Sequence, residues 1–267
     1  MKKQIKQPEP HQLEQFEDYI NLFTLIPGGS GNGVVMLRKI VDSIHSSSFE
    51  SSQYKPLSFL ITGPSGCGKR LAAKALANSL ALADVRECPG KYLDYGINSN
   101  HFFQDSTFST CHIIAGIQEA KRCESVLWRY LKEGKCNYFN PMDGTFSKVI
   151  YAYGLIIMTA TSTKDIPLPL LKVTTHVVEL EPYTIEQIKC ILHQVLFFMG
   201  QEYQGEAVLQ ELVKIYPVTI KKSIELLKMS INLMRAELKD YLTIDLVGKT
   251  KRLMGEAVTE FDDEIPF

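Results

Sequence analysis

The chain has 267 residues, of which 45% are hydrophobic and 22% charged, and its formal net charge is −1. These values are ordinary for a soluble globular protein, and the net charge excludes a general electrostatic attraction to nucleic acid. No run approaches the roughly 20 apolar residues of a membrane span, and the polar start lacks the apolar core of a signal peptide. The six cysteines and six histidines show no metal-ligand spacing, which favours reduced thiols in a cytoplasmic protein and no metal site.

The first expected elements surround a glycine-rich loop. Residues 1–20 are predicted to be a flexible polar arm, and the apolar spacing of residues 33–45 predicts a helix. Residues 57–62 form an apolar run typical of a buried parallel strand, and residues 69–82 have helical apolar spacing. The residues between and at the start of this helix are the candidate nucleotide site: Gly63, Pro64, Ser65, Gly66, Cys67, Gly68, Lys69 and Arg70.

This loop satisfies the phosphate-binding pattern G-x-x-x-x-G-K through Gly63, Gly68 and Lys69. A strand, a glycine turn and a helix in this order direct backbone N–H groups and the positive helix end at an anion. Arg70 stands where a Ser or Thr would bind magnesium. We expect its guanidinium to lie beside Lys69 and to replace part of the metal's charge. The loop is therefore predicted to bind ATP or ADP with a reduced dependence on magnesium. The alternative is a turn that binds nothing.

The later elements complete an α/β pattern. Strands are predicted at residues 110–114, 149–160 and 176–180, and helices at residues 117–132, 184–199, 206–215 and 219–239. Thr184 and Gln187 form a capping box at one helix start, and Gly200 ends that helix. The expected fold class is α/β: a three-layer αβα parallel P-loop sheet followed by a small all-α lid domain. The expected domains are an arm (1–20), a nucleotide-binding domain (21–181), a lid (182–240) and a linker with an acidic docking tail (241–267).

The stretch from Ala160 to the helix after Thr184 resembles AAA+ ATPases, and more narrowly RuvB-type branch-migration motors. Ala160, Thr161 and Ser162 match the end of that family's sensor strand, and LEPYTIE at residues 180–186 matches the start of its first lid helix. The resemblance covers roughly residues 21–240. It implies a AAA+ fold, nucleotide binding and assembly into homo- or hetero-oligomers. A chance match within other P-loop proteins, such as clamp-loader subunits, is the alternative.

The resemblance also assigns the catalytic carboxylates, and they are missing. The Asp-Glu pair that would hold magnesium and polarise water falls on Ala115 and Gly116. Glu119 comes three residues late, and we interpret it as a solvated helix residue. Together with Arg70, these positions leave no residue to which a catalytic role is assigned, so useful ATP hydrolysis is not expected.

The resemblance assigns three further functional positions, and the residues found there match the family only in part. The arginine finger falls on Val173, and the adjacent Lys172 would need a shift of register. The first sensor falls on Thr161, which is otherwise an ordinary residue at a strand end. The sensor arginine of the lid falls near Lys221, which with Lys222 either contacts phosphate or forms a solvated helix start.

The last nine residues resemble the acidic tip of bacterial single-stranded-DNA-binding proteins. A terminal aromatic ring with its own carboxylate suits an apolar pocket that has a basic rim. The residues expected to dock a partner are Asp262, Asp263, Glu264, Ile265, Pro266 and Phe267. The alternative is an acidic solubility tail. No winged-helix domain, which RuvB-type motors use to bind DNA, fits in the remaining length, so contact with DNA is expected to be indirect or weak.

These observations favour a RuvB-like nucleotide-binding protein in DNA replication, recombination or repair, which is a hydrolysis-deficient subunit or an adaptor. Two other functions stay open. An active ATP-dependent Holliday-junction helicase would release phosphate in response to DNA. A pure interaction protein would divert the partners of single-strand-binding protein without using its nucleotide pocket.

Overall fold

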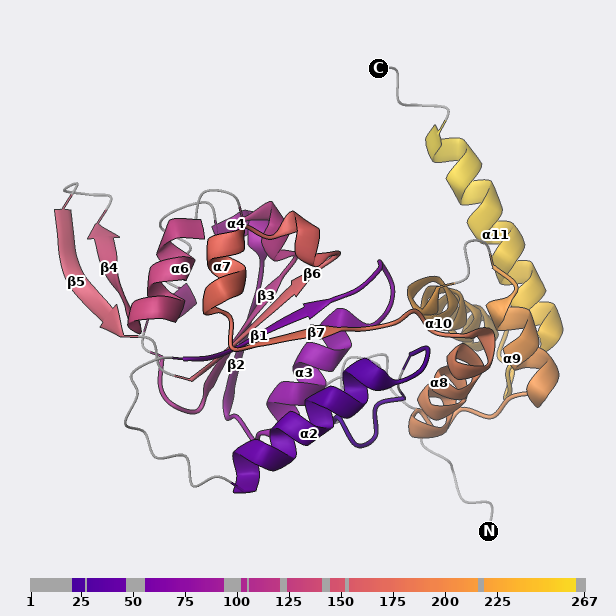
Figure 1. The fold of residues 1–267 in the computed structure, drawn as a ribbon. Coiled ribbons are helices and arrows are strands. Elements are labelled where there is room, and N and C mark those ends of the chain that lie inside the picture. Colours follow the sequence, from indigo (N-terminus) through magenta and orange to yellow (C-terminus); the bar gives the residue numbers. More distant parts are fainter. Residues whose placement is uncertain are drawn as a thin grey trace, which may run out of the picture. The chain divides into compact units, whose positions relative to one another are not determined.

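The computed structural model describes residues 21–26, 28–46, 56–93, 102–104, 106–120, 124–140, 145–151, 154–215 and 219–262. The chain divides into two compact units between Pro182 and Tyr183. The first unit combines a sheet with helices, and the second is built from helices (Figure 1). Across these described residues, no helix combines the length and the apolar character that a membrane span requires.

A five-stranded parallel sheet in the order β2-β3-β6-β1-β7 forms the centre of the first unit. Its strands are β1 (Leu57–Thr62), β2 (Asp84–Pro89), β3 (Thr110–Ala115), β6 (Leu155–Ala160) and β7 (His176–Glu179). The register pairs Thr62 with Ala160 on one side and with Glu179 on the other, and it pairs Pro89 with Ala115. The carboxyl ends of the strands therefore form one edge, where ligands of open α/β sheets bind.

Helices cover both faces of this sheet (Figure 1). On one face lie α2 (Asn32–Ser46) and α3 (Lys69–Ser79), and on the other lie α4 (Gly90–Leu93), α6 (Glu124–Glu133) and α7 (Leu168–Val173). Successive strand residues point to opposite faces, and the second face buries a cluster that includes Leu60, Ile114, Ile156, Tyr130 and Leu170. The predicted three-layer α/β arrangement is confirmed.

A separate antiparallel hairpin corrects one prediction. The hairpin contains β4 (Lys135–Asn140) and β5 (Thr145–Tyr151), and β6 begins only at Leu155. The single strand expected at residues 149–160 is therefore wrong. Gly154 has a φ of 87°, and a Cβ there would lie 2.1 Å from the carbonyl oxygen of Thr110. This glycine turn interrupts an apolar run that looked continuous in the sequence.

The helix expected at residues 117–132 is also interrupted. The structure has a short 3₁₀ turn, η1 (Ile117–Glu119), and α6 starts only at Glu124. Gly116 enters this turn with a φ of 71°, and Ala120 leaves it with a φ of −88° and a ψ of 64°. Neither residue has helical geometry, so the helical periodicity on both sides of Ala120 belongs to two elements. A second 3₁₀ turn, η2 (Thr163–Asp165), follows β6.

The second unit contains α8 (Ile185–Phe198), α9 (Glu206–Val213), α10 (Ile220–Ala236) and α11 (Ile244–Asp262). The capping box at Thr184 is present: its side chain accepts from the N–H of Gln187, whose side chain accepts from the N–H of Thr184. Gly200, which follows α8, has a φ of 60°. The helix α11 occupies much of the stretch that we expected to be a linker. The Lys251 ammonium contacts Glu211 at 2.6 Å and joins α11 to α9.

A histidine is completely buried in the sheet unit. His112 on β3 has no exposed surface, and its Nε2 lies 2.8 Å from the hydroxyl of Ser106. The rings of Phe102 and Phe103 have their centroids 4.9 Å and 5.1 Å from the imidazole. Burial, with a smaller contribution from Arg86, lowers the pKa of His112 from 6.5 to about 4. The imidazole is therefore neutral in the folded protein at neutral pH.

Candidate nucleotide-binding site

The loop after β1 has a backbone that requires glycine. Gly66 and Gly68 have φ angles of 81° and 80°, and Gly63 has a φ of 144°. A Cβ at position 63 would lie 2.4 Å from the carbonyl oxygen of Leu180 and 2.8 Å from the sulfur of Cys67. Both separations are shorter than real Cβ contacts. Glycine at position 63 therefore allows the loop to lie directly against the backbone that follows β7.

Lys69 places a positive charge against the same loop. Its Nζ donates hydrogen bonds of 2.7 Å to the carbonyl oxygens of Gly63 and Pro64, and it lies 4.0 Å from the sulfur of Cys67. Burial raises the pKa of the Cys67 thiol by more than the neighbouring Lys69 ammonium lowers it. The thiol is therefore protonated at neutral pH, and Lys69 supplies the charge of the loop.

The N-terminus of α3 adds backbone donors beside Lys69. Gly68 is the N-cap residue in left-handed geometry, no side chain caps this end, and the first turn contains no acidic residue. The first N–H groups of a helix have no partner within the helix, and the helix dipole favours an anion there. The loop, the helix end and Lys69 together fit the phosphate groups of a nucleotide.

Arg70 lies in a different place from the one we expected. Its Nη2 donates a hydrogen bond of 2.9 Å to Oε2 of Glu87, and its Nε contacts the other oxygen of that carboxylate. Glu87 stands on β2, two residues before that strand ends at Pro89, and β3 and β6 separate β2 from β1. The guanidinium is thus drawn toward β2 and not toward the loop.

The two positions assigned to catalytic carboxylates carry no acid and belong to a turn. Ala115 ends β3, and Gly116 follows in left-handed geometry with its N–H donated to the hydroxyl of Thr159 at 3.1 Å. Glu119 is exposed, and its Oε1 lies 3.4 Å from the position that a Cβ on Gly116 would take. These residues offer no carboxylate at either of the two family positions.

The residues at this edge do not fit a magnesium ion. Its two protein anchors would be at Arg70 and Ala115, and magnesium binds through oxygen ligands. Across the described part of the chain, no three acidic, histidine or cysteine side chains come together as a possible metal site. The two positions that would anchor magnesium therefore offer it no oxygen ligand from a side chain.

Thr161 and Val173 can be placed within the sheet unit. The register pairs Ala160, the last residue of β6, with Thr62, the last residue of the neighbouring β1. Thr161 and Gly63 follow these two residues, so both lie at the carboxyl edge of the sheet. The hydroxyl of Thr161 donates to Asp165 at 2.9 Å. Val173 ends α7 and packs against the buried cluster, whereas Lys172 beside it is exposed. Val173 is therefore a packing residue, and the role of Thr161 as a sensor stays a prediction.

Lys221 and the tail belong to the second unit. Lys221 lies in the first turn of α10, with an exposed side chain and its Nζ 3.9 Å from Oε1 of Glu225. Its neighbour Lys222 donates its backbone N–H to the hydroxyl of Thr219, the cap of this helix. Asp262 is the last residue of α11. The other docking residues, 263–267, lie outside the described residues, so the docking tip stays a prediction.

A second glycine-rich segment, at residues 28–33, was missed in the sequence. A Cβ on Gly33 would lie 2.2 Å from the carbonyl oxygen of Glu179, and one on Gly28 would lie 2.3 Å from that of Glu181. The Ser30 hydroxyl donates to Oε1 of Glu181 at 2.6 Å, and its N–H donates to the other oxygen. These two bonds lower the pKa of Glu181. The sequence GGSGNG was the signal for this close approach.

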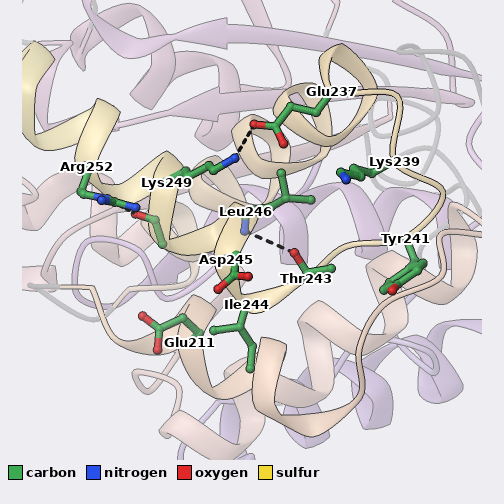
Figure 2. A pocket seen from close by; sticks show the side chains of 11 residues that line it. Glu211, Glu237, Lys239, Tyr241, Thr243, Ile244, Asp245, Leu246, Lys249 and Arg252 are labelled. Carbon is green, nitrogen blue, oxygen red and sulfur yellow. Dashed lines mark hydrogen bonds and ion pairs between the residues drawn. The ribbon is translucent and has the colours of Figure 1, made fainter.

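The helical unit has a pocket of its own, with a volume of about 650 Å³. Figure 2 shows Lys249 directed at Glu237, which it contacts at 2.8 Å, and the N–H of Leu246 directed at the hydroxyl of Thr243. Three basic and three acidic residues line the pocket: Lys239, Lys249, Arg252, Glu211, Glu237 and Asp245. This balance of charge favours neither an anionic nor a cationic ligand.

Comparison with known structures identifies the fold. A variant of RuvB from Thermotoga maritima matches with a TM-score of 0.70 and 18% identity, covering 88% of this chain and 73% of that one. The structure of the Thermotoga maritima RuvB Holliday junction branch migration motor matches with a TM-score of 0.69 and 19% identity, covering 90% and 73%. At this identity the match establishes the fold alone, which is the α/β fold of the Thermotoga maritima RuvB structures.

Sequence comparison gives a shorter match. No protein-family profile matches the chain. The proteasome-associated ATPase of Saccharopolyspora erythraea is 46% identical over 57 residues, which are 20% of this chain and 10% of that protein. The chain thus spans about a tenth of the length of this curated relative, and the match bears on a local segment.

Proposed function

We propose that the protein binds ATP or ADP at residues 63–70 and hydrolyses it slowly or not at all. One combination of features carries the proposal: a glycine loop with Lys69 at an uncapped helix end lies on a AAA+ sheet, while Ala115 and Gly116 stand at the carboxylate positions. Each missing catalytic group typically costs orders of magnitude in rate. Binding without turnover makes the pocket a ligand-responsive element and not a motor.

The test is equilibrium binding of a fluorescent ATP analogue, measured in magnesium and again in EDTA. We expect similar affinity in both buffers, because Arg70 and Ala115 offer no ligand to the metal. Lys69→Ala should abolish binding, since it removes the charge that lies against the loop. Inorganic phosphate release by the same samples should stay at background. Absence of binding in both buffers would refute the proposal, and brisk magnesium-dependent phosphate release would refute its second half.

We further propose a role in DNA replication, recombination or repair, as a non-catalytic subunit of a AAA+ oligomer or as an adaptor in the cytoplasm. The support is the fold shared with RuvB and the resemblance of the last residues to the tip of single-strand-binding proteins. A pull-down from bacterial lysate with intact protein and with Phe267 deleted tests the tip. We expect partners that bind single-strand-binding protein to be lost with Phe267, and identical partners from both would contradict docking.

A further inference from the structure

We propose that Glu87 lowers nucleotide affinity by competing with the triphosphate for Arg70. The inference rests on the proposed function, because it concerns the regulation of the same phosphate site. It starts from the ion pair at the beginning of α3, in which the Arg70 guanidinium contacts both carboxylate oxygens of Glu87. Two-point pairing of this kind is the geometry in which arginine also binds phosphate.

Arg70 is within reach of an anion at the loop through its place in the helix. It is the second residue of α3, directly after Lys69, so its backbone lies in the first turn at the positive end of the helix. A phosphate group at this helix end therefore lies beside the Arg70 backbone. The side chain is long and 60% exposed, so it can rotate toward such an anion without disturbing the core.

Glu87 holds the guanidinium away from that anion. It lies two residues below the carboxyl edge of β2, a displacement of about 7 Å along the strand. The order β2-β3-β6-β1 also places it three strands from β1, about 14 Å across the sheet. A phosphate at the loop lies beyond the carboxyl edge. The Glu87 carboxylate and the phosphate thus lie in different directions from the Arg70 backbone. The guanidinium can contact only one of them at a time.

The size of the effect follows from the exposure of the pair. Glu87 is 22% exposed and Arg70 is 60% exposed, and such pairs are worth roughly 0.2–1 kcal/mol, which corresponds to about a 1.5- to 5-fold effect. When only a fraction of molecules has the binding-competent arrangement, the apparent affinity falls by that fraction. With a pairing constant K of about 1.5–5, that fraction is 1/(1 + K), so removal of the Glu87 charge should tighten nucleotide binding by about two- to sixfold.

The experiment compares dissociation constants for a fluorescent ATP analogue in EDTA. Glu87→Gln should bind about two- to sixfold more tightly than wild type, and Arg70→Ala about tenfold more weakly. In the double variant, the gain from Glu87→Gln should disappear. Asp84→Asn is the matched control, because Asp84 is the other acid on β2 and pairs with Arg86 at 2.7 Å. It should bind as wild type does. Thermal melting reports whether each variant is folded.

The possible outcomes separate the two proposals. If wild type binds and Glu87→Gln binds equally or more weakly, competition for Arg70 is refuted while the nucleotide site stands. The same follows if Glu87→Gln tightens binding in the absence of Arg70. If neither wild type nor Glu87→Gln binds the analogue, both proposals fail. Should Glu87→Gln not fold, Glu87→Asp takes its place, and its shorter side chain should give a smaller gain in the same direction.

Discussion

Replacement of Gly63 by alanine should destabilise the sheet unit strongly. The backbone at this position has a φ of 144°, and the added Cβ would lie 2.4 Å from the carbonyl oxygen of Leu180. A strained backbone conformation costs about 1–3 kcal/mol, and overpacking of a rigid neighbour costs about 1–3 kcal/mol more. The clash is with the backbone after β7, which cannot rotate away as a side chain could. We therefore expect a loss of unfolding free energy of about 2–6 kcal/mol.

A loss of this size is measurable by thermal unfolding. For a unit of this length, it corresponds to a fall in melting temperature of about 5–20 °C. Gly200→Ala is the control, because Gly200 also has a positive φ, 60°, but among the described residues beyond its chain neighbours no atom lies within 4 Å of its Cβ position. It should cost only the backbone strain, about 1–2 kcal/mol. If Gly63→Ala melts like wild type or like Gly200→Ala, the close approach at Leu180 does not constrain the loop.

Three further predictions concern stability. Because the pKa of His112 is lowered to about 4 from 6.5, the unfolded chain binds a proton that the folded chain does not, so stability should fall by about 3 kcal/mol as pH drops from 6.5 to 4. Denaturant titrations measure the loss of unfolding free energy across that range for wild type and for His112→Phe. Equal losses in the two proteins would contradict the prediction. Thr184→Ala removes one bond of the capping box and should cost about 1 kcal/mol, with Thr184→Ser close to wild type in urea unfolding. Lys251→Ala breaks the contact with Glu211 and should cost about 1 kcal/mol, and an unchanged urea midpoint would show that this pair does not hold α11 on α9.

The sequence predicted the elements whose residues have one dominant pattern. The strand at Leu57–Thr62 is a continuous apolar run, and the helix start at Thr184 has two capping partners at fixed spacing. By contrast, β2 was missed because it is an edge strand with the mixed sequence DVRECP and no continuous buried face. The short α7, with the sequence LPLLKV, was missed because it is only six residues long. Local patterns fail where an element depends on neighbours for its burial.

The residues of the candidate site also divide into those that the sequence predicts and those that it does not. The loop residues follow from local spacing, because glycine, lysine and the helix start are adjacent in the chain. The pairing of Arg70 with Glu87 joins residues 17 positions apart, and that of Ser30 with Glu181 joins residues 151 apart. Neither could be read from composition or periodicity, since the sheet order alone decides which segments become neighbours. The exchange that we propose at Arg70 is therefore visible only in three dimensions.

The left-handed turn at Gly116 has an evolutionary consequence. With a φ of 71° and its N–H committed to Thr159, this backbone disfavours any residue that carries a Cβ. Glutamate at position 116 would therefore strain the backbone, and this strain would oppose the placement of its carboxylate as a base for a water molecule. A gain of hydrolysis through an acid at this position would require the turn to be rebuilt together with the acid, so a single substitution would not be sufficient.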